Sequence, residues 1–171
     1  MAETVEGTRG DLESRHAAAA RVVSLVFMLT LGLAALALFV APRVKLGGDP
    51  VTANTLLIVI LFLGLGSVFF RRTRFSAMRL QDVGALRGAE GLLDTLQTTT
   101  VIVAGIAALI AVLGLLISVM TAAGTDMLYF GVIALAVLLY AYPRRAAWES
   151  VVRATEQGEG DPVRAAKGTL A

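Results

Sequence analysis

The chain alternates between long apolar stretches that contain no charged residue and shorter segments that hold almost all of its charges. The uncharged stretches cover residues 22–41, 51–70, 95–125 and 127–143. A helix needs about 20 apolar residues to cross roughly 30 Å of hydrocarbon, and one charge at mid-bilayer costs on the order of 3 kcal/mol. The pattern therefore predicts an all-α integral membrane protein, a four-transmembrane-helix bundle with helices over about 22–41, 51–70, 98–123 and 127–143.

The segments outside the predicted spans are also expected to be partly helical. Within 71–97, apolar residues recur near helical spacing, which predicts a helical cytoplasmic connection, in one piece or divided into two by its glycines. The fourth helix is expected to continue as an extension over 144–157, with a kink at Pro143. Residues 158–171 are expected to form a disordered tail, and Gly124 is expected to end the third helix in the left-handed conformation.

The distribution of positive charge predicts the orientation in the membrane. Thirteen of the 15 Lys and Arg residues fall in the N-terminal segment 1–21, the connection 71–97 and the segment after residue 143. Cytoplasmic segments carry such an excess, so both termini are predicted to be cytoplasmic. The Arg-rich, Lys-poor composition is typical of a bacterial protein. We therefore expect the protein to lie in the bacterial cytoplasmic (inner) membrane.

Composition agrees with the membrane class and changes the meaning of the net charge. The chain has 171 residues, 57% of them hydrophobic, with a formal net charge of +2 and a mean hydropathy of +0.77. In a soluble protein a basic balance would suggest nucleic acid, but here it is the orientation signal. The expected partners are the lipid bilayer with anionic phospholipid, and other membrane subunits or further copies of the chain, with no nucleic acid.

The two halves of the chain share a pattern that indicates a possible duplication. Arg71-Arg72 and Arg144-Arg145 each follow a span, with an aromatic residue two positions before and three positions after the pair. The pattern is consistent with a tandem repeat of two helical hairpins. The alternative is that helices leaving a membrane generally show aromatic residues followed by arginines.

Small side chains mark the third and fourth helices as the candidates for close packing. Helices in a bilayer associate through small residues that let their backbones approach. Such a stripe is expected to pack this chain's own bundle, or alternatively an oligomer. The candidate packing residues are Ala104, Gly105, Ala108, Ala111, Gly114, Ser118, Gly131 and Ala134; Gly64 and Gly66 would let the second helix approach a neighbour.

Residues that carry chemistry are scarce. The chain has no Cys and one His, His16, which lies before the first span and is interpreted as an ordinary interfacial residue. The spans hold no Asp or Glu, so no proton relay, metal site or catalytic pair is visible in them. We therefore predict no catalytic residue, no cofactor and no metal, and that the protein is not an enzyme.

One cluster of arginines and aromatic residues is a candidate contact surface. Arginines next to the membrane gain about 1 kcal/mol each near an anionic leaflet, so the cluster predicts a topology anchor that contacts anionic lipid. The alternative is a docking surface for an acidic partner. The candidate residues are Arg71, Arg72, Arg74, Phe75, Arg79, Arg144, Arg145 and Trp148.

Two functions are compatible with these observations. Short loops, uncharged spans and helical cytoplasmic extensions favour a non-catalytic accessory, scaffold or assembly subunit of a larger membrane complex. Hydroxyl-bearing and small residues of the third helix leave open a small channel or transporter built from a duplicated hairpin. A cofactor site completed by a partner chain is a third, less favoured interpretation.

Overall fold

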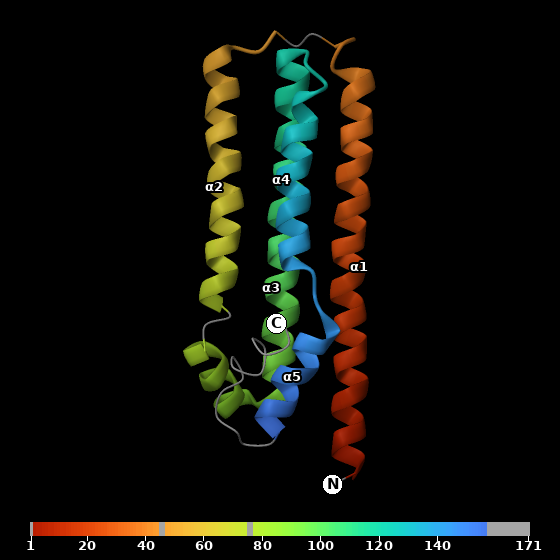
Figure 1. The fold of residues 1–171 in the computed structure, drawn as a ribbon, viewed down its shortest axis with the longest axis vertical. Coiled ribbons are helices and arrows are strands. Elements are labelled where there is room, and N and C mark those ends of the chain that lie inside the picture. The colour runs from red at the N-terminus through yellow and green to blue at the C-terminus, as the bar shows by residue number, and fades with distance from the viewer. Residues whose placement is uncertain (1, 45–46, 75–76, 157–171) are drawn as a thin grey trace. The chain divides into compact units, whose positions relative to one another are not determined.

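A computed structural model describes the backbone of residues 2–44, 47–74 and 77–156, and the side chains of residues 10–44, 47–74 and 90–150. Every element in these ranges is an α-helix (Figure 1). The helices are α1 (Ala2–Val40), α2 (Pro50–Arg74), α3 (Ala77–Thr121), α4 (Asp126–Ala141) and α5 (Arg145–Glu156).

Four of the helical stretches are long and apolar enough to cross a membrane. They belong to α1, α2, α3 and the α4–α5 region, in the order that the hydrophobic pattern predicts. The prediction of an all-α protein with four apolar helices is confirmed, and the chain is a multi-pass membrane protein by this criterion.

Two helices extend well beyond the predicted spans. α1 begins at Ala2 and α3 begins at Ala77, whereas the predicted spans begin at 22 and 98. Charged residues such as Glu, Arg and Lys are good helix formers in water, so a helix continues where its apolar stretch stops. The glycines in the connection 71–97 do not interrupt α3, which is one continuous helix over Ala77–Thr121.

The continuous extension expected after the fourth span is interrupted. α4 ends at Ala141, residues 142–144 are not helical, and α5 begins at Arg145. Pro143 has no backbone N–H, and its ring clashes with the preceding helical turn. The backbone N–H groups of Ala147 and Trp148 then donate to the carbonyl of Arg144, at 3.0 and 3.3 Å, and start the new helix. The predicted tail 158–171 lies outside the described residues.

The chain forms two compact units. The charged unit comprises residues 1–22, 70–101 and 142–171, and the apolar unit comprises residues 23–69 and 102–141. α1 and α3 contribute a segment to each unit. The charged unit has a core of five buried side chains from α1, α3 and α5: Leu12, Ala19, Leu93, Leu96 and Trp148.

In the apolar unit, α3 and α4 pack most closely. A Cβ atom added to Gly114 of α3 would lie 2.5 Å from Cβ of Phe130 in α4. α2 meets α4 at Gly64, where an added Cβ would lie 3.6 Å from Cγ2 of Ile133. α1 and α2 lie on either side of α3 and α4 in this unit (Figure 1). The most apolar stretches of the candidate spans differ in the share of their residues that is buried. This share is 44% in each of the last two spans, 17% in the span of α1 and 11% in the span of α2.

The turn between α3 and α4 differs from its prediction. Ala122, and not Gly124, takes the left-handed conformation, with φ of 55°. The N–H of Ala123 donates to the carbonyl of Ser118 at 3.1 Å, which is the pattern of a Schellman cap. Gly124 is needed for a different reason, because a Cβ there would lie 2.9 Å from the carbonyl oxygen of Ala37 in α1.

Candidate functional site

The core of the charged unit is centred on Trp148. This side chain is 4% exposed and lies among apolar residues of α1 and α3. The His16 ring meets it edge-on, with ring centroids 5.5 Å apart and an interplanar angle of 89°. Edge-to-face contacts of this kind add to the stabilisation from buried area, so α5 is fixed against α1 by an aromatic pair.

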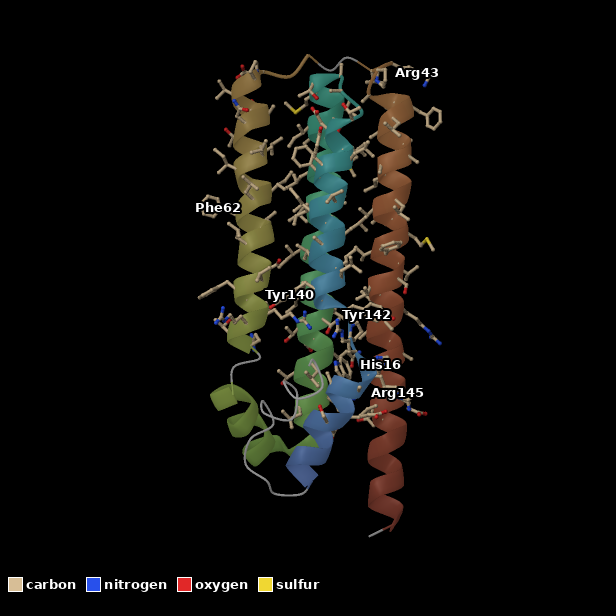
Figure 2. The ribbon with its side chains drawn as sticks, viewed as in Figure 1. His16, Arg43, Phe62, Tyr140, Tyr142 and Arg145 are labelled. Atoms are coloured by element: carbon tan, nitrogen blue, oxygen red, sulfur yellow. The ribbon has the colours of Figure 1, made fainter. Side chains whose placement is uncertain are left out.

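His16 also satisfies the backbone where the helix breaks. Its Nε2 lies 2.9 Å from the carbonyl oxygen of Pro143. A carbonyl only accepts hydrogen bonds, so Nε2 carries the proton and donates. Residue 143 is buried, and a buried carbonyl without a donor costs free energy. The histidine interpreted as interfacial is therefore a structural link between α1 and the α4–α5 connection, and His16 lies near α5 in Figure 2.

Arg15 joins acidic groups of α1 and α3. Its Nε lies 3.0 Å from Asp11 one turn earlier, and its terminal nitrogens lie 3.6 Å from Glu90 and 3.6 Å from Asp94. The hydrogen bond to Asp11 raises the pKa of Arg15 most, the charges of Glu90 and Asp94 add to this, and partial burial opposes it. The guanidinium therefore stays charged and holds the two helices together.

Arg145 makes a second bridge, between α5 and α1. It donates to Glu149 at 2.8 Å and to Glu13 at 2.6 Å. These two hydrogen bonds, that to Glu149 first, raise the pKa of Arg145. Both bridges are internal to the charged unit, and neither places a nucleophile or a proton donor in a cleft.

The predicted contact surface is divided by this packing. Arg72, Arg74 and Arg144 are exposed, and Arg71 is half-buried. The guanidinium of Arg74 lies over the Phe70 ring, 5.4 Å from its centroid. By contrast, Trp148 is buried, and Arg145, which is exposed, pairs with two carboxylates of the charged unit. Phe75 and the side chain of Arg79 lie outside the described residues.

Most of the predicted packing residues of the third and fourth helices are buried, and all of them belong to the apolar unit. Ala108 is half-buried and Gly105 is exposed, so the small-residue stripe does not face inward along its whole length. The buried members are Ala104, Ala111, Gly114, Ser118, Gly131 and Ala134.

A cavity that the sequence does not reveal lies among α2, α3 and α4 of the apolar unit. It has a volume of about 390 Å³ and is mostly apolar, with Asn54, Thr121 and Asp126 as its polar lining. A carboxylate oxygen of Asp126 accepts a hydrogen bond from the Thr121 hydroxyl at 2.9 Å. The sequence indicates Asp126 only as a candidate for the N-cap of the fourth helix, with Thr125 as the other, because Asp and Thr are both common at that position.

Most of the hydroxyl groups buried in the helices are occupied locally. Of the five buried hydroxyl residues in the described part of the chain, which include Thr99, four donate to a carbonyl three or four residues earlier in their own helix, at 2.7 to 2.9 Å; these four are Thr30, Ser67, Thr100 and Ser118. Among the described residues, no three His, Asp or Glu side chains lie close enough to hold a metal ion.

Comparisons with protein-family models, curated proteins and solved structures give no match. The proposals below therefore rest on the residues and geometry of this chain.

Proposed function

We propose that this protein is a non-catalytic accessory, scaffold or assembly subunit of a larger membrane complex. The observation that carries the proposal is the outer face of α2, defined by Ile58, Phe62, Leu65, Gly66 and Phe69. These positions are spaced i, i+4, i+7, i+8 and i+11, which places them on one side of a helix. All five are exposed.

Apart from Gly66, the residues on this face have large side chains. Within the described residues of the apolar unit, no other helix covers them. Phe62 is 72% exposed and Leu65 is 71% exposed. Figure 2 shows Phe62 pointing away from the other helices. Either lipid or a helix of another subunit can cover such a face. Gly66 favours a helix of another subunit.

Two glycines of α2 have opposite surroundings. Gly64 is buried, and a Cβ added there would make an ordinary van der Waals contact with Ile133 of α4, at 3.6 Å from its Cγ2. A Cβ on Gly66 would meet nothing within 4 Å. Glycine in a helix costs about 1 kcal/mol relative to alanine, and nothing within the described residues offsets this cost at Gly66. Close approach of a helix from another chain would offset it.

A photo-crosslinking experiment tests the proposal in native membranes. A benzoylphenylalanine at position 62 should give a protein adduct of one discrete mass. The substitution Gly66→Leu should reduce that adduct about tenfold, which corresponds to a loss of about 1.4 kcal/mol of association free energy. Gly32→Leu is the matched control, because Gly32 of α1 is exposed in the same way, with nothing within 4 Å of an added Cβ, but lies on a different helix from the crosslinker at position 62. Adducts to lipid alone would contradict the proposal.

We further propose the bacterial inner membrane, with both termini in the cytoplasm. The excess of Lys and Arg on one side supports this orientation. Since the chain has no native cysteine, single cysteines at Val44 and Thr73 provide a test, and both positions are exposed. A membrane-impermeant maleimide should label position 44 and not position 73 in intact cells. The reverse pattern would refute the orientation.

The exposed arginines of the charged unit support contact with anionic phospholipid. Arg72, Arg74 and Arg144 are exposed, and each such residue contributes about 1 kcal/mol near an anionic leaflet. Replacing all three by Gln should weaken binding of phosphatidylglycerol to the detergent-solubilised protein, and should leave binding of a neutral lipid unchanged; unchanged binding of phosphatidylglycerol would contradict the contact.

A duplicated hairpin remains part of the proposal. Long α1 is followed by shorter α2, and long α3 is followed by shorter α4. Leu12 and Leu93, each followed directly by an acidic residue and, four positions on, by His16 or Gln97, lie in the same buried core. We also propose that the N-terminal part of α3 and the helix α5 are cytoplasmic helical extensions.

The channel or transporter alternative has less support. A polar pathway needs hydroxyl groups that face a common lumen, but the buried hydroxyls of Thr30, Ser67 and Ser118 donate to carbonyls of their own helices. Proteoliposomes that show flux of ions or small solutes above that of empty liposomes would favour the alternative.

A further inference from the structure

The cavity of the apolar unit has the composition of a ligand site. Its volume of about 390 Å³ is within the range of small-molecule pockets, which are mostly apolar with a few polar groups that fix orientation. The apolar walls come from three helices: Ile60 of α2, Ile117 of α3, and Phe130 and Ile133 of α4.

The polar lining has a definite chemical character. Asp126 is the one charged residue that lines the cavity, and Asn54 and Thr121 accompany it. A carboxylate repels an anion and accepts hydrogen bonds from a cation. Asp126 accepts one from Thr121, and the roughly four lone-pair sites of a carboxylate leave capacity for further donors.

The ring of Tyr129 adds to this preference for a cation. Tyr129 lines the same cavity, and aromatic faces attract ammonium groups. The ligand that fits such walls and such a polar lining has an apolar body and a positively charged head with N–H donors.

We propose that this cavity binds an amphiphile with a primary ammonium group, which hydrogen-bonds to Asp126 while its hydrocarbon contacts Ile60, Ile117 and Phe130. Both an aminophospholipid and a free long-chain amine have this chemistry. The site is independent of the outer face of α2, so it can be tested apart from the scaffold function.

Native mass spectrometry of the full chain in detergent measures the binding directly. The probes are phosphatidylethanolamine and phosphatidylcholine with identical chains, and dodecylamine and dodecyltrimethylammonium. Each pair keeps the positive charge but removes the N–H donors in its second member. Hydrogen bonds to charged groups contribute more than neutral ones, so the primary ammonium ligand should bind about tenfold more tightly than its trimethylated counterpart.

Asp126→Asn tests the carboxylate. Asp126 lies in the first turn of α4, where the loss of a charge costs only about 0.3–1 kcal/mol, so α4 should be retained, while the preference for the primary ammonium ligand should fall to less than about twofold. Asp49→Asn is the matched control, because Asp49 is an exposed acid of the same unit that does not line the cavity. Ala53→Phe places a ring in the cavity and should weaken binding of all four probes, which keeps the proposal testable if D126N does not fold.

The outcomes separate the two sources of the ligand. A preference shown only in the phospholipid pair identifies a lipid site, and one shown only in the single-chain pair identifies a free amine; either supports the proposal. No preference in either pair, or a preference that D126N leaves unchanged, would overturn it.

Discussion

The contact between α3 and α4 at Gly114 gives the sharpest prediction about packing. Gly114→Ala adds one methyl group, which would lie 2.5 Å from Cβ of Phe130 and 3.1 Å from its Cγ. A Cβ atom is attached directly to the backbone and cannot swing aside as the end of a flexible side chain can. The two helices themselves must therefore move apart.

The magnitude follows from a comparison with Gly66→Ala. Both substitutions gain about 1 kcal/mol of helix propensity, so this contribution cancels between them. The added methyl at Gly66 meets nothing within 4 Å, whereas overpacking a tight contact typically costs about 1–3 kcal/mol. We expect G114A to be less stable than G66A by about 1–3 kcal/mol.

Unfolding of the purified variants by SDS in mixed micelles, followed by far-UV circular dichroism, measures this difference. Purified monomer is used so that any partner of Gly66 does not contribute. If G114A and G66A had equal free energies of unfolding, α3 and α4 would not approach at Gly114, and the packing of the apolar unit described above would be refuted.

Substitutions at three further positions test other parts of the structure. Trp148→Ala should lose about 3–5 kcal/mol of unfolding free energy, as expected for a buried aromatic side chain, and Trp148→Phe should lose less; a loss below about 1 kcal/mol would contradict the burial. His16→Phe keeps a ring against Trp148 but removes the donor to Pro143, so α5 amides should exchange faster with deuterium by the equivalent of about 1–3 kcal/mol, and unchanged exchange would contradict the hydrogen bond. Ser118→Ala should change stability by less than about 1 kcal/mol and leave liposome permeability unchanged, because the hydroxyl donates within its own helix; a changed permeability would indicate a pore.

The sequence by itself determined the class of the protein and its main elements. Four uncharged apolar stretches of sufficient length require helices, since in lipid a single segment must satisfy its own backbone hydrogen bonds. The interruption of the extension near Pro143 was also indicated, because proline lacks the donor that a helix needs, although a full break in place of a kink was not.

Only the tertiary structure decided which side of each helix faces the other helices. In water, the apolar side of a helix identifies the core, but lipid is as apolar as a protein interior, so hydropathy does not distinguish the two sides of a span. Gly64 and Gly66 look alike in the sequence, yet one is buried against Ile133 and the other is exposed.

The same limit applies to the candidate sites. Trp148 looks like a surface anchor next to arginines, but its burial depends on α1 and α3, which are distant in sequence. The bridges from Arg15 to Glu90 and Asp94, and the cavity beside Asp126, likewise join residues from different helices. Local sequence fixes where a helix forms, whereas these contacts depend on how the helices are brought together.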